Sequence, residues 1–94
     1  MLVQWIERAL KNLDEIAEYI GQDNSKAALA VIFRIVSAAA GLEQYPSSGR
    51  PGRIAGTREL VVPGTPFIVP YRVQRNEIEI LRVFHGSREW PVDF

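Results

Sequence analysis

Apolar residues recur along this chain with a helical spacing first and with a strand-like spacing later. From Glu7 onward every third or fourth residue is apolar, which predicts an amphipathic helix over residues 7–20 that ends at Gly21. The apolar positions of this stretch are Ala9, Leu10, Leu13, Ile16, Ala17 and Ile20. Asp23 or Asn24 is suited to cap a second helix, and Tyr45-Pro46 stops it.

The second predicted helix is apolar over most of its length. Arg34 is the one charged residue between Lys26 and Glu43. Its apolar positions include Ala28, Val31, Ile32, Ile35, Val36, Ala39 and Leu42. Two interpretations stay open: the helix is packed between its partner helix and a sheet, or part of it is exposed for a binding partner. The short connection between the two helices predicts an antiparallel hairpin.

Strand patterns lie on both sides of this helix pair. Residues 2–5 read as a short first strand, and after a loop over 47–56 three more strands are expected at 58–62, 67–73 and 77–84. The alternation slips near Leu81, which suggests a bulge. Pro70 cannot donate a ladder hydrogen bond and indicates an edge or an irregularity. The sequence therefore predicts an α+β fold of order β-α-α-β-β-β, a helix hairpin packed on a small, antiparallel-rich sheet, as one domain over 1–94.

Composition narrows the class of protein. The 94 residues include no cysteine, which excludes disulfides, thiolate metal sites and a cysteine nucleophile, and which is compatible with a reducing cytoplasm. We expect no membrane span, because no apolar run approaches the roughly 20 residues that one needs. The N-terminal segment lacks the layout of a signal peptide. We therefore expect a cytoplasmic protein.

The net charge is zero, but the charges are unevenly distributed. Residues 1–49 carry four basic and six acidic groups, whereas residues 50–94 carry seven arginines, five acidic groups and His85. Arginine suits bidentate contacts with carboxylate or phosphate. The excess of two positive charges in the second half is small for a protein that binds nucleic acid directly.

The order of elements and several local sequences resemble the RelE/ParE superfamily of toxins from bacterial type II toxin–antitoxin systems. The matching segments are VQW (3–5), LDEIAEYI (13–20), AA (27–28), PSSGRPGR (46–53), GTRELVV (56–62), YRV (71–73) and IEILRVFH (78–85). Together they cover essentially the whole chain in the expected order. Each segment alone is weakly specific, whereas the series is specific.

The resemblance implies a partner, a small antitoxin that wraps the toxin and neutralises it. It also implies one of two targets. ParE-type members inhibit DNA gyrase and are not hydrolases, and RelE-type members cut messenger RNA on the ribosome without a metal. Neither cofactor nor metal is expected, and operator DNA would be bound only through the antitoxin. A homodimer or a heterotetramer with the antitoxin is compatible with the apolar second helix.

A metal-free ribonuclease needs a base, an acid and cations for the phosphorane. The candidates are His85 as acid or base, with Arg58, Arg72, Arg82 and Arg88 as phosphate ligands. Arg88 resembles a basic residue of nuclease members by its offset from Gly86. Alternatively, His85 hydrogen-bonds the loop before Trp90 and orders the tail. The arginines could likewise form ion pairs with the glutamates of neighbouring strands.

Two features of the sequence favour gyrase inhibition over cleavage. The chain has two lysines where RelE-type enzymes are lysine-rich, and its end carries Trp90 and Phe94 where they commonly place a tyrosine. A gyrase inhibitor needs a binding surface and no aligned acid and base. The residues expected to bind the target or the antitoxin are Arg50, Arg53, Arg58, Arg82, Trp90 and Phe94. A member that binds its antitoxin but has lost toxicity is a third hypothesis.

Overall fold

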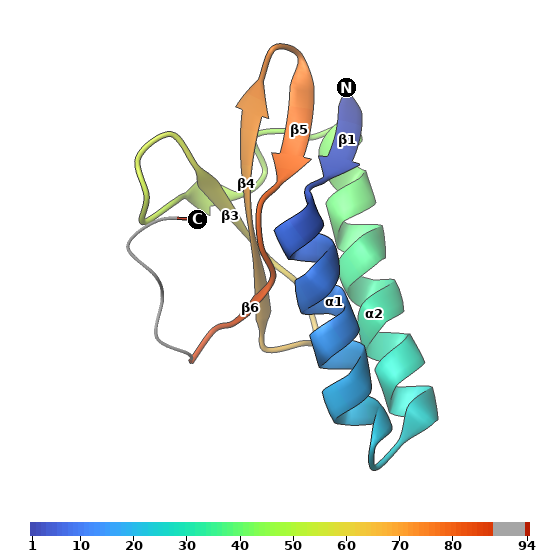
Figure 1. Ribbon diagram of the computed structural model, residues 1–94. Helices are drawn as coiled ribbons and strands as arrows, with labels where there is room; N and C mark the ends of the chain where they lie inside the picture. Colours follow the sequence, from blue (N-terminus) through green and yellow to red (C-terminus); the bar gives the residue numbers. More distant parts are fainter. Residues whose placement is uncertain (88–93) are drawn as a thin grey trace.

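The computed structural model describes residues 1–87 and Phe94, and it has the predicted α+β order. The helices are α1 (Glu7–Gly21) and α2 (Ser25–Ala40), followed by a 3-10 turn at Gly41–Glu43. The strands are β1 (Leu2–Trp5), β2 (Arg50–Pro51), β3 (Arg58–Val61), β4 (Phe67–Gln74), β5 (Glu77–Ile80) and β6 (Phe84–His85). The helix pair covers one face of the sheet, and the C-terminus lies on the side of the other face (Figure 1).

The helix boundaries follow from local chemistry. The Asn24 side chain accepts a hydrogen bond from the backbone N–H of Ala27 at 3.0 Å, so Asn24 is the cap of α2. Gly21 is the last residue of α1 rather than the residue after it, and Gln22 still donates its backbone N–H to Glu18. α2 ends at Ala40, five residues before the predicted stop at Tyr45, because the chain tightens there into the 3-10 turn.

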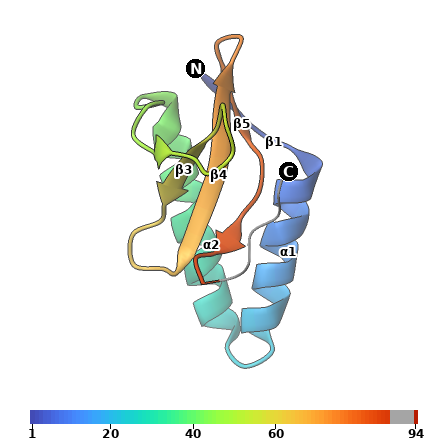
Figure 2. The ribbon, with the colours of Figure 1, turned by 90° about the vertical axis from the view of Figure 1, so that its left-hand side faces the viewer.

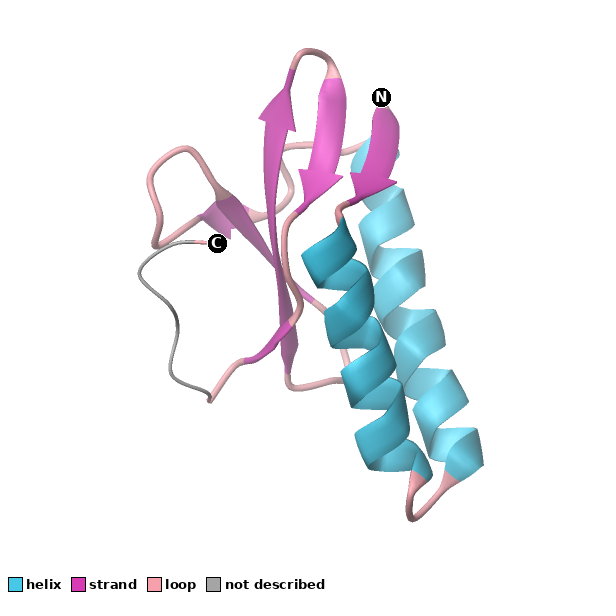
Figure 3. Cartoon of the chain, in the orientation of Figure 1, coloured by secondary structure: helices cyan, strands magenta, loops and turns pink. Residues whose placement is uncertain are grey.

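The sheet has the order β1-β5-β4-β3-β2, and β6 also pairs with β4. Most pairs are antiparallel, but β1 runs parallel to β5 (Figure 3). Trp5 lies opposite Ile80 in this register. The two-residue turn between β4 and β5 places Arg75 and Asn76 at φ of 53° and 64°, the left-handed conformation that a type I′ hairpin needs. The sheet lies across the helix pair (Figure 2).

A bulge divides the last predicted strand, 77–84, into β5 and β6. Ile80 pairs with Tyr71 and Phe84 pairs with Ile68, so three residues of this segment lie opposite two residues of β4. The predicted slip near Leu81 is thus confirmed. Because of the extra residue, Ile80 and Phe84 lie on opposite faces of the sheet instead of the same one.

Pro70 lies in β4, which is the central strand and not an edge, so the predicted irregularity is confirmed and the predicted edge is wrong. The carbonyl of Pro70 accepts the backbone N–H of Leu81 at 2.9 Å. Since the N–H and C=O of one strand residue point to the same side, the donor that proline lacks also faces the bulge. The ladder is already interrupted there, and so the missing donor leaves no regular pair unmade.

The core lies between the helices and the inner face of the sheet. Val69, Tyr71, Ile78 and Ile80 are fully buried there. From the helices come Ala9 and Leu13 of α1 and Ile35 and Ala39 of α2. Outside this cluster, Ile68, Pro70, Leu81 and Phe84 are buried on the outer face. The outer face is therefore partly covered by apolar groups as well.

By length and composition, the helical run Ser25–Glu43 is apolar enough to cross a membrane, since Arg34 interrupts the run without removing its overall apolar character. The core helix of a globular protein can have the same length and composition, so this property does not contradict the expectation of no membrane span. Only 22% of this segment is buried inside the protein. One of its faces, with Ile35, Ala39 and Leu42, packs in the core as in a globular domain, and the remainder is exposed.

Asn12 of α1 connects the helix to the bulge. Its Oδ1 accepts hydrogen bonds from Val83 N at 3.0 Å and from Arg82 Nε at 2.9 Å. We predict that Asn12→Ala lowers the free energy of unfolding by about 1–3 kcal/mol, because the buried Val83 N–H loses its acceptor. Urea unfolding followed by circular dichroism measures this. The exposed Gln22→Ala serves as the control and should stay within about 0.5 kcal/mol; an equal loss in both variants would contradict the assignment.

Candidate functional site

The loop between α2 and β3 is anchored on one buried tyrosine. The Tyr71 hydroxyl donates to the carbonyl of Pro46 at 2.8 Å and accepts the backbone N–H of Gly49 at 2.9 Å. A Cβ at Gly49 would lie 2.6 Å from that hydroxyl, so only glycine permits the approach. Arg58 donates to the carbonyls of Gly49 and Ser47 at 2.8 and 3.3 Å. The guanidinium of Arg58 is therefore used to hold this loop.

Glu59 organises two of the predicted arginines. Its carboxylate is 3% exposed; Oε1 accepts from Arg50 at 3.0 and 3.1 Å, and Oε2 accepts the backbone N–H of Arg53 at 2.9 Å. The Arg53 Nε lies 3.5 Å from Oε2. The Arg50 and Arg53 side chains nevertheless remain 51% and 47% exposed. A buried carboxylate thus fixes two cations whose outer sides stay accessible.

Arg72 lies on the same face of the sheet as Glu59. It stands opposite Glu79 in the register of β4 and β5, and its Nε lies 2.5 Å from Oε1 of that glutamate. By alternation along β4, Arg72 shares the outer face with Pro70, whose partner Glu59 carries Arg50. We call the exposed side chains of Arg50, Arg53 and Arg72 the arginine face.

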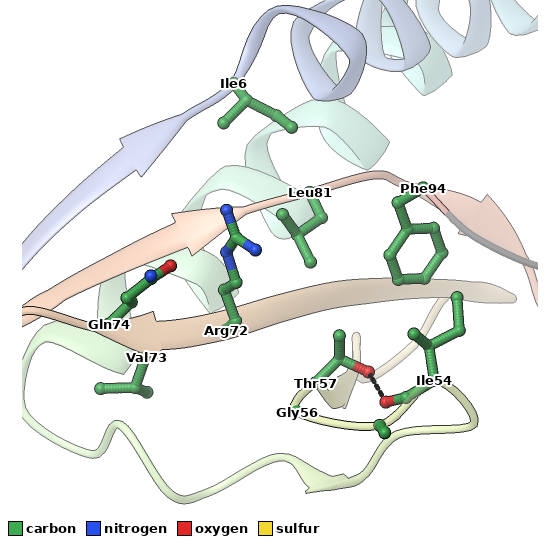
Figure 4. Close-up of a pocket in the computed structure, with 10 residues that line it drawn as sticks. Ile6, Ile54, Gly56, Thr57, Arg72, Val73, Gln74, Leu81 and Phe94 are labelled. Atoms are coloured by element: carbon green, nitrogen blue, oxygen red, sulfur yellow. Dashed lines mark hydrogen bonds between the residues drawn. The ribbon is translucent and has the colours of Figure 1, made fainter.

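An open pocket of about 560 Å³ adjoins the arginine face (Figure 4). Arg72, Leu81 and Phe94 point into the same space (Figure 4). The pocket is lined by Ile6, Ile54, Ala55, Gly56, Thr57, Arg72, Val73, Gln74, Leu81 and Phe94. It joins one guanidinium to an apolar floor, which suits a partner side chain with an acidic or polar end.

The end of the chain completes this face. The Phe94 ring lies 6.0 Å from the Phe84 ring, centroid to centroid, and the Phe94 carbonyl accepts a hydrogen bond from Arg8. Arg82 lies in the bulge, with its guanidinium carbon 4.7 Å from the centre of the Phe84 ring. The Nε of Arg82 is bound to Asn12, so Arg82 does not pair with a strand glutamate. The predicted Arg88 and Trp90 lie outside the described residues.

His85 lies on the opposite face, in a groove beside the helices. Its ring meets the Phe67 ring edge-on at 5.6 Å, and its Nδ1 lies 3.2 Å from the backbone N of Ser87 and 2.8 Å from the Ser87 hydroxyl. The groove has a volume of about 760 Å³. It is lined by Glu15, Ile16, Tyr19, Ile20, Val31, Pro66, Phe67, His85 and Ser87. We call it the His85 groove, and its lining is mainly apolar.

The structure separates His85 from the arginines that were its predicted companions. His85 pairs with Phe67, and Phe67 and Arg72 are five residues apart on β4, which is about 16 Å along the strand. Arg72 also points to the other face. Arg58 stands opposite Tyr71, four residues from Phe67, and it is bound into the loop. No group of three His, Asp or Glu side chains that could hold a metal ion occurs among residues 1–87 and Phe94.

Three residues that shape the site were not predicted from the sequence: Tyr71, Asn12 and the buried Glu59. Glu59 was considered only as an ion-pair partner for strand arginines, and Tyr71 only as part of a matching segment. Asn12 and Tyr71 act on residues far along the chain, 71 positions for Asn12 and Val83 and 22 for Tyr71 and Gly49, whereas Glu59 binds Arg50 and Arg53 at nine and six positions. For Glu59 and Tyr71, a polar residue within an apolar strand segment was the local signal available.

Comparison with known proteins relates this chain to toxins. The family described as "ParE toxin of type II toxin-antitoxin system, parDE" matches residues 3–90. A protein of Sinorhizobium fredii named as a toxin, Y4kP, is 51% identical over 89 residues, covering 95% of this chain and 92% of that protein. Toxin RelE2 of Caulobacter vibrioides is 40% identical over 86 residues, covering 92% and 96%.

Solved structures give the same relation. A structure of the chromosomal ParDE system of P. aeruginosa aligns with a TM-score of 0.83 at 33% identity, over 90% of this chain and 95% of that one. The RelBE2 toxin–antitoxin complex of Mycobacterium tuberculosis aligns with a TM-score of 0.65 at 26% identity, over 89% and 95%. The helix pair on a mixed, mostly antiparallel sheet is thus the fold of these structures.

The role of Glu59 can be tested by proteolysis. In Glu59→Gln the buried carboxylate that fixes Arg50 and Arg53 is lost, and we expect the 50–57 loop to open at least fivefold more often, a loss of about 1–3 kcal/mol. Trypsin should then cut faster after Arg53. Glu79→Gln breaks the more exposed pair with Arg72 and should not change this rate. Equal cleavage of both variants and the natural protein would show that Glu59 does not hold the loop.

Proposed function

This chain belongs to the ParE toxin family of type II toxin–antitoxin systems, and from this we infer that it arrests growth by inhibiting DNA gyrase in the cytoplasm. A cognate antitoxin neutralises it. The inhibition is by binding, without cleavage of a covalent bond. The family that matches residues 3–90 supports this choice of target, and so does the arrangement of the candidate side chains.

The separation of His85 from the arginines is the observation that carries the proposal. Metal-free RNA cleavage requires an acid, a base and a cation within hydrogen-bond reach of one phosphate. His85 and Arg72 lie on opposite faces of the sheet, about 16 Å apart along β4. Nδ1 of His85 is also engaged by Ser87. These contacts fit the structural role of His85, to order the chain after β6, better than a role in proton transfer.

A binding inhibitor needs a rigid polar surface, and the arginine face supplies one. Arg50 and Arg53 are fixed by a buried carboxylate, so little side-chain freedom is lost when they bind a partner. Arg72 and Phe94 border an adjoining pocket. Arginine and aromatic residues are enriched in protein interfaces. We therefore assign the arginine face to the target.

The antitoxin is assigned to the other side of the sheet. The His85 groove is largely apolar and open, and Tyr19 at its rim is 77% exposed. An amphipathic segment with apolar anchors would fill such a groove. The structural relatives from P. aeruginosa and M. tuberculosis are toxin–antitoxin systems, which supports a partner of this kind.

The second candidate is RelE-like cleavage of messenger RNA on the ribosome. The 40% identity to the Caulobacter toxin RelE2 favours it. Under this alternative the catalytic side chains are His85, Arg88, Arg72 and Arg58. The third candidate is a non-toxic member that only binds its antitoxin. Under this hypothesis none of these residues is required for toxicity. Growth arrest on induction, relieved by coexpression of the antitoxin, would exclude it.

The two targets are separated by paired assays on the purified protein. We predict inhibition of gyrase supercoiling and no new mRNA ends on translating ribosomes. The double variant His85→Ala, Arg88→Ala should keep growth inhibition within about twofold, because neither side chain is assigned to the target. Ribosome-dependent cleavage that this double variant abolishes would replace the gyrase proposal with the nuclease.

The arginine face has its own test. We predict that Arg72→Gln raises the concentration needed for half-inhibition of gyrase about tenfold, as expected for the loss of one well-placed guanidinium contact. Glu79→Gln is the matched control, because it breaks the same ion pair but leaves the guanidinium in place. Both variants should still bind the antitoxin. If Arg72→Gln inhibits gyrase as well as the natural protein, the target does not bind at this face.

A further inference from the structure

α2 carries a second apolar surface that the fold does not use. Leu29, Phe33 and Val36 are 73%, 72% and 40% exposed, and their spacing of four and three residues places them on one line along the helix. Ala40 follows four residues later and is also exposed. We call these four residues the α2 stripe. Large apolar side chains this exposed in a row indicate a surface that a partner covers.

The α2 stripe is distinct from the face of α2 that builds the core. Ile35, Ala39 and Leu42 are fully buried, and at 100° per residue they centre about 120° around the helix from the stripe. Arg34 does not interrupt the stripe, because its guanidinium reaches the carbonyl of Pro63 at 3.4 Å. Between Lys26 and Glu43, the α2 stripe therefore contains only apolar side chains.

We propose that the α2 stripe binds a second copy of this chain, with the two α2 helices antiparallel about a twofold axis. The register follows from the side chains. With the axis between Arg34 and Ile35, Phe33 of one copy lies opposite Val36 of the other. Leu29 then lies opposite Ala40, and Lys26 lies opposite Glu43. In all three pairs the midpoint of the two residue numbers falls between 34 and 35, so a single twofold arrangement forms all three contacts.

Size and charge both favour this pairing over a parallel one. The larger residue of each apolar pair meets a smaller one, so the side chains interdigitate, and Ala40 permits close approach of the helices. At the two ends the symmetric pair brings Lys26 and Glu43 of opposite copies together twice. A parallel pair would set Lys26 against Lys26 and Glu43 against Glu43, which are like charges. The seam is one helix of 16 residues, about 24 Å long, and we expect a weak dimer in the micromolar range.

The absence of native cysteine allows a direct test of the register. We predict that the double variant Leu29→Cys, Ala40→Cys forms a covalent dimer on mild oxidation, seen on a non-reducing gel. Leu29→Cys alone should not, because the two copies of residue 29 would lie about 16 Å apart along the helices, beyond disulfide reach. A mixture of the Leu29→Cys and Ala40→Cys single variants should give only the mixed dimer. A dimer formed by Leu29→Cys alone would mean a parallel arrangement and would overturn the proposal.

Sedimentation of the full chain measures the association itself. Phe33→Glu should weaken self-association at least tenfold without changing the circular dichroism spectrum, since Phe33 is exposed. Lys26→Glu alone should weaken it severalfold, and Lys26→Glu with Glu43→Lys should restore it. A natural protein that stays monomeric at hundreds of micromolar, while Phe33→Glu loses antitoxin binding, would show that the antitoxin covers this stripe instead. The readout needs no target, so it is independent of the gyrase assay.

Discussion

β4 has a proline, Pro70, at its middle. The bulge opposite this proline determines which side chains of the last strand segment lie on each face of the sheet. Pro70 has no N–H to donate toward the neighbouring strand. In that strand a bulge places three residues opposite two residues of β4. Because side chains alternate with a period of two, that one extra residue moves His85 to the helix side and Phe84 to the outer side. The bulge is held in place by Asn12, which accepts the free N–H of Val83.

The functional assignment depends on this geometry. Without the bulge, a continuous strand over 77–85 would place His85 on the outer face with Arg72, as in a site built for phosphate. With it, the histidine closes an apolar groove while the guanidinium groups gather around Glu59 and the pocket at Phe94. A rigid, cationic surface from which His85 is separated is suited to binding a partner rather than to cleaving one.

The three exposed surfaces carry different chemistry and so suit different partners. The arginine face is polar and fixed by ion pairs with Glu59 and Glu79, the His85 groove is apolar and concave, and the α2 stripe is apolar and convex. The fold keeps them apart: the helix pair lies between the stripe and the sheet, and the sheet lies between the groove and the arginine face. The three surfaces have no residue in common.

The sequence by itself determined the order of elements, a helix cap at Asp23 or Asn24, the slip near Leu81 and the family. Those features are local, since helix and strand periods and cap residues are read within a few positions. Tertiary structure alone decided that Arg58 holds a loop carbonyl, that Arg50 and Arg53 share Glu59, and that His85 faces away from Arg72. The reason is physical. A side chain's partner depends on strand register and on which face of the sheet it occupies, and one inserted residue reverses the face without changing the composition.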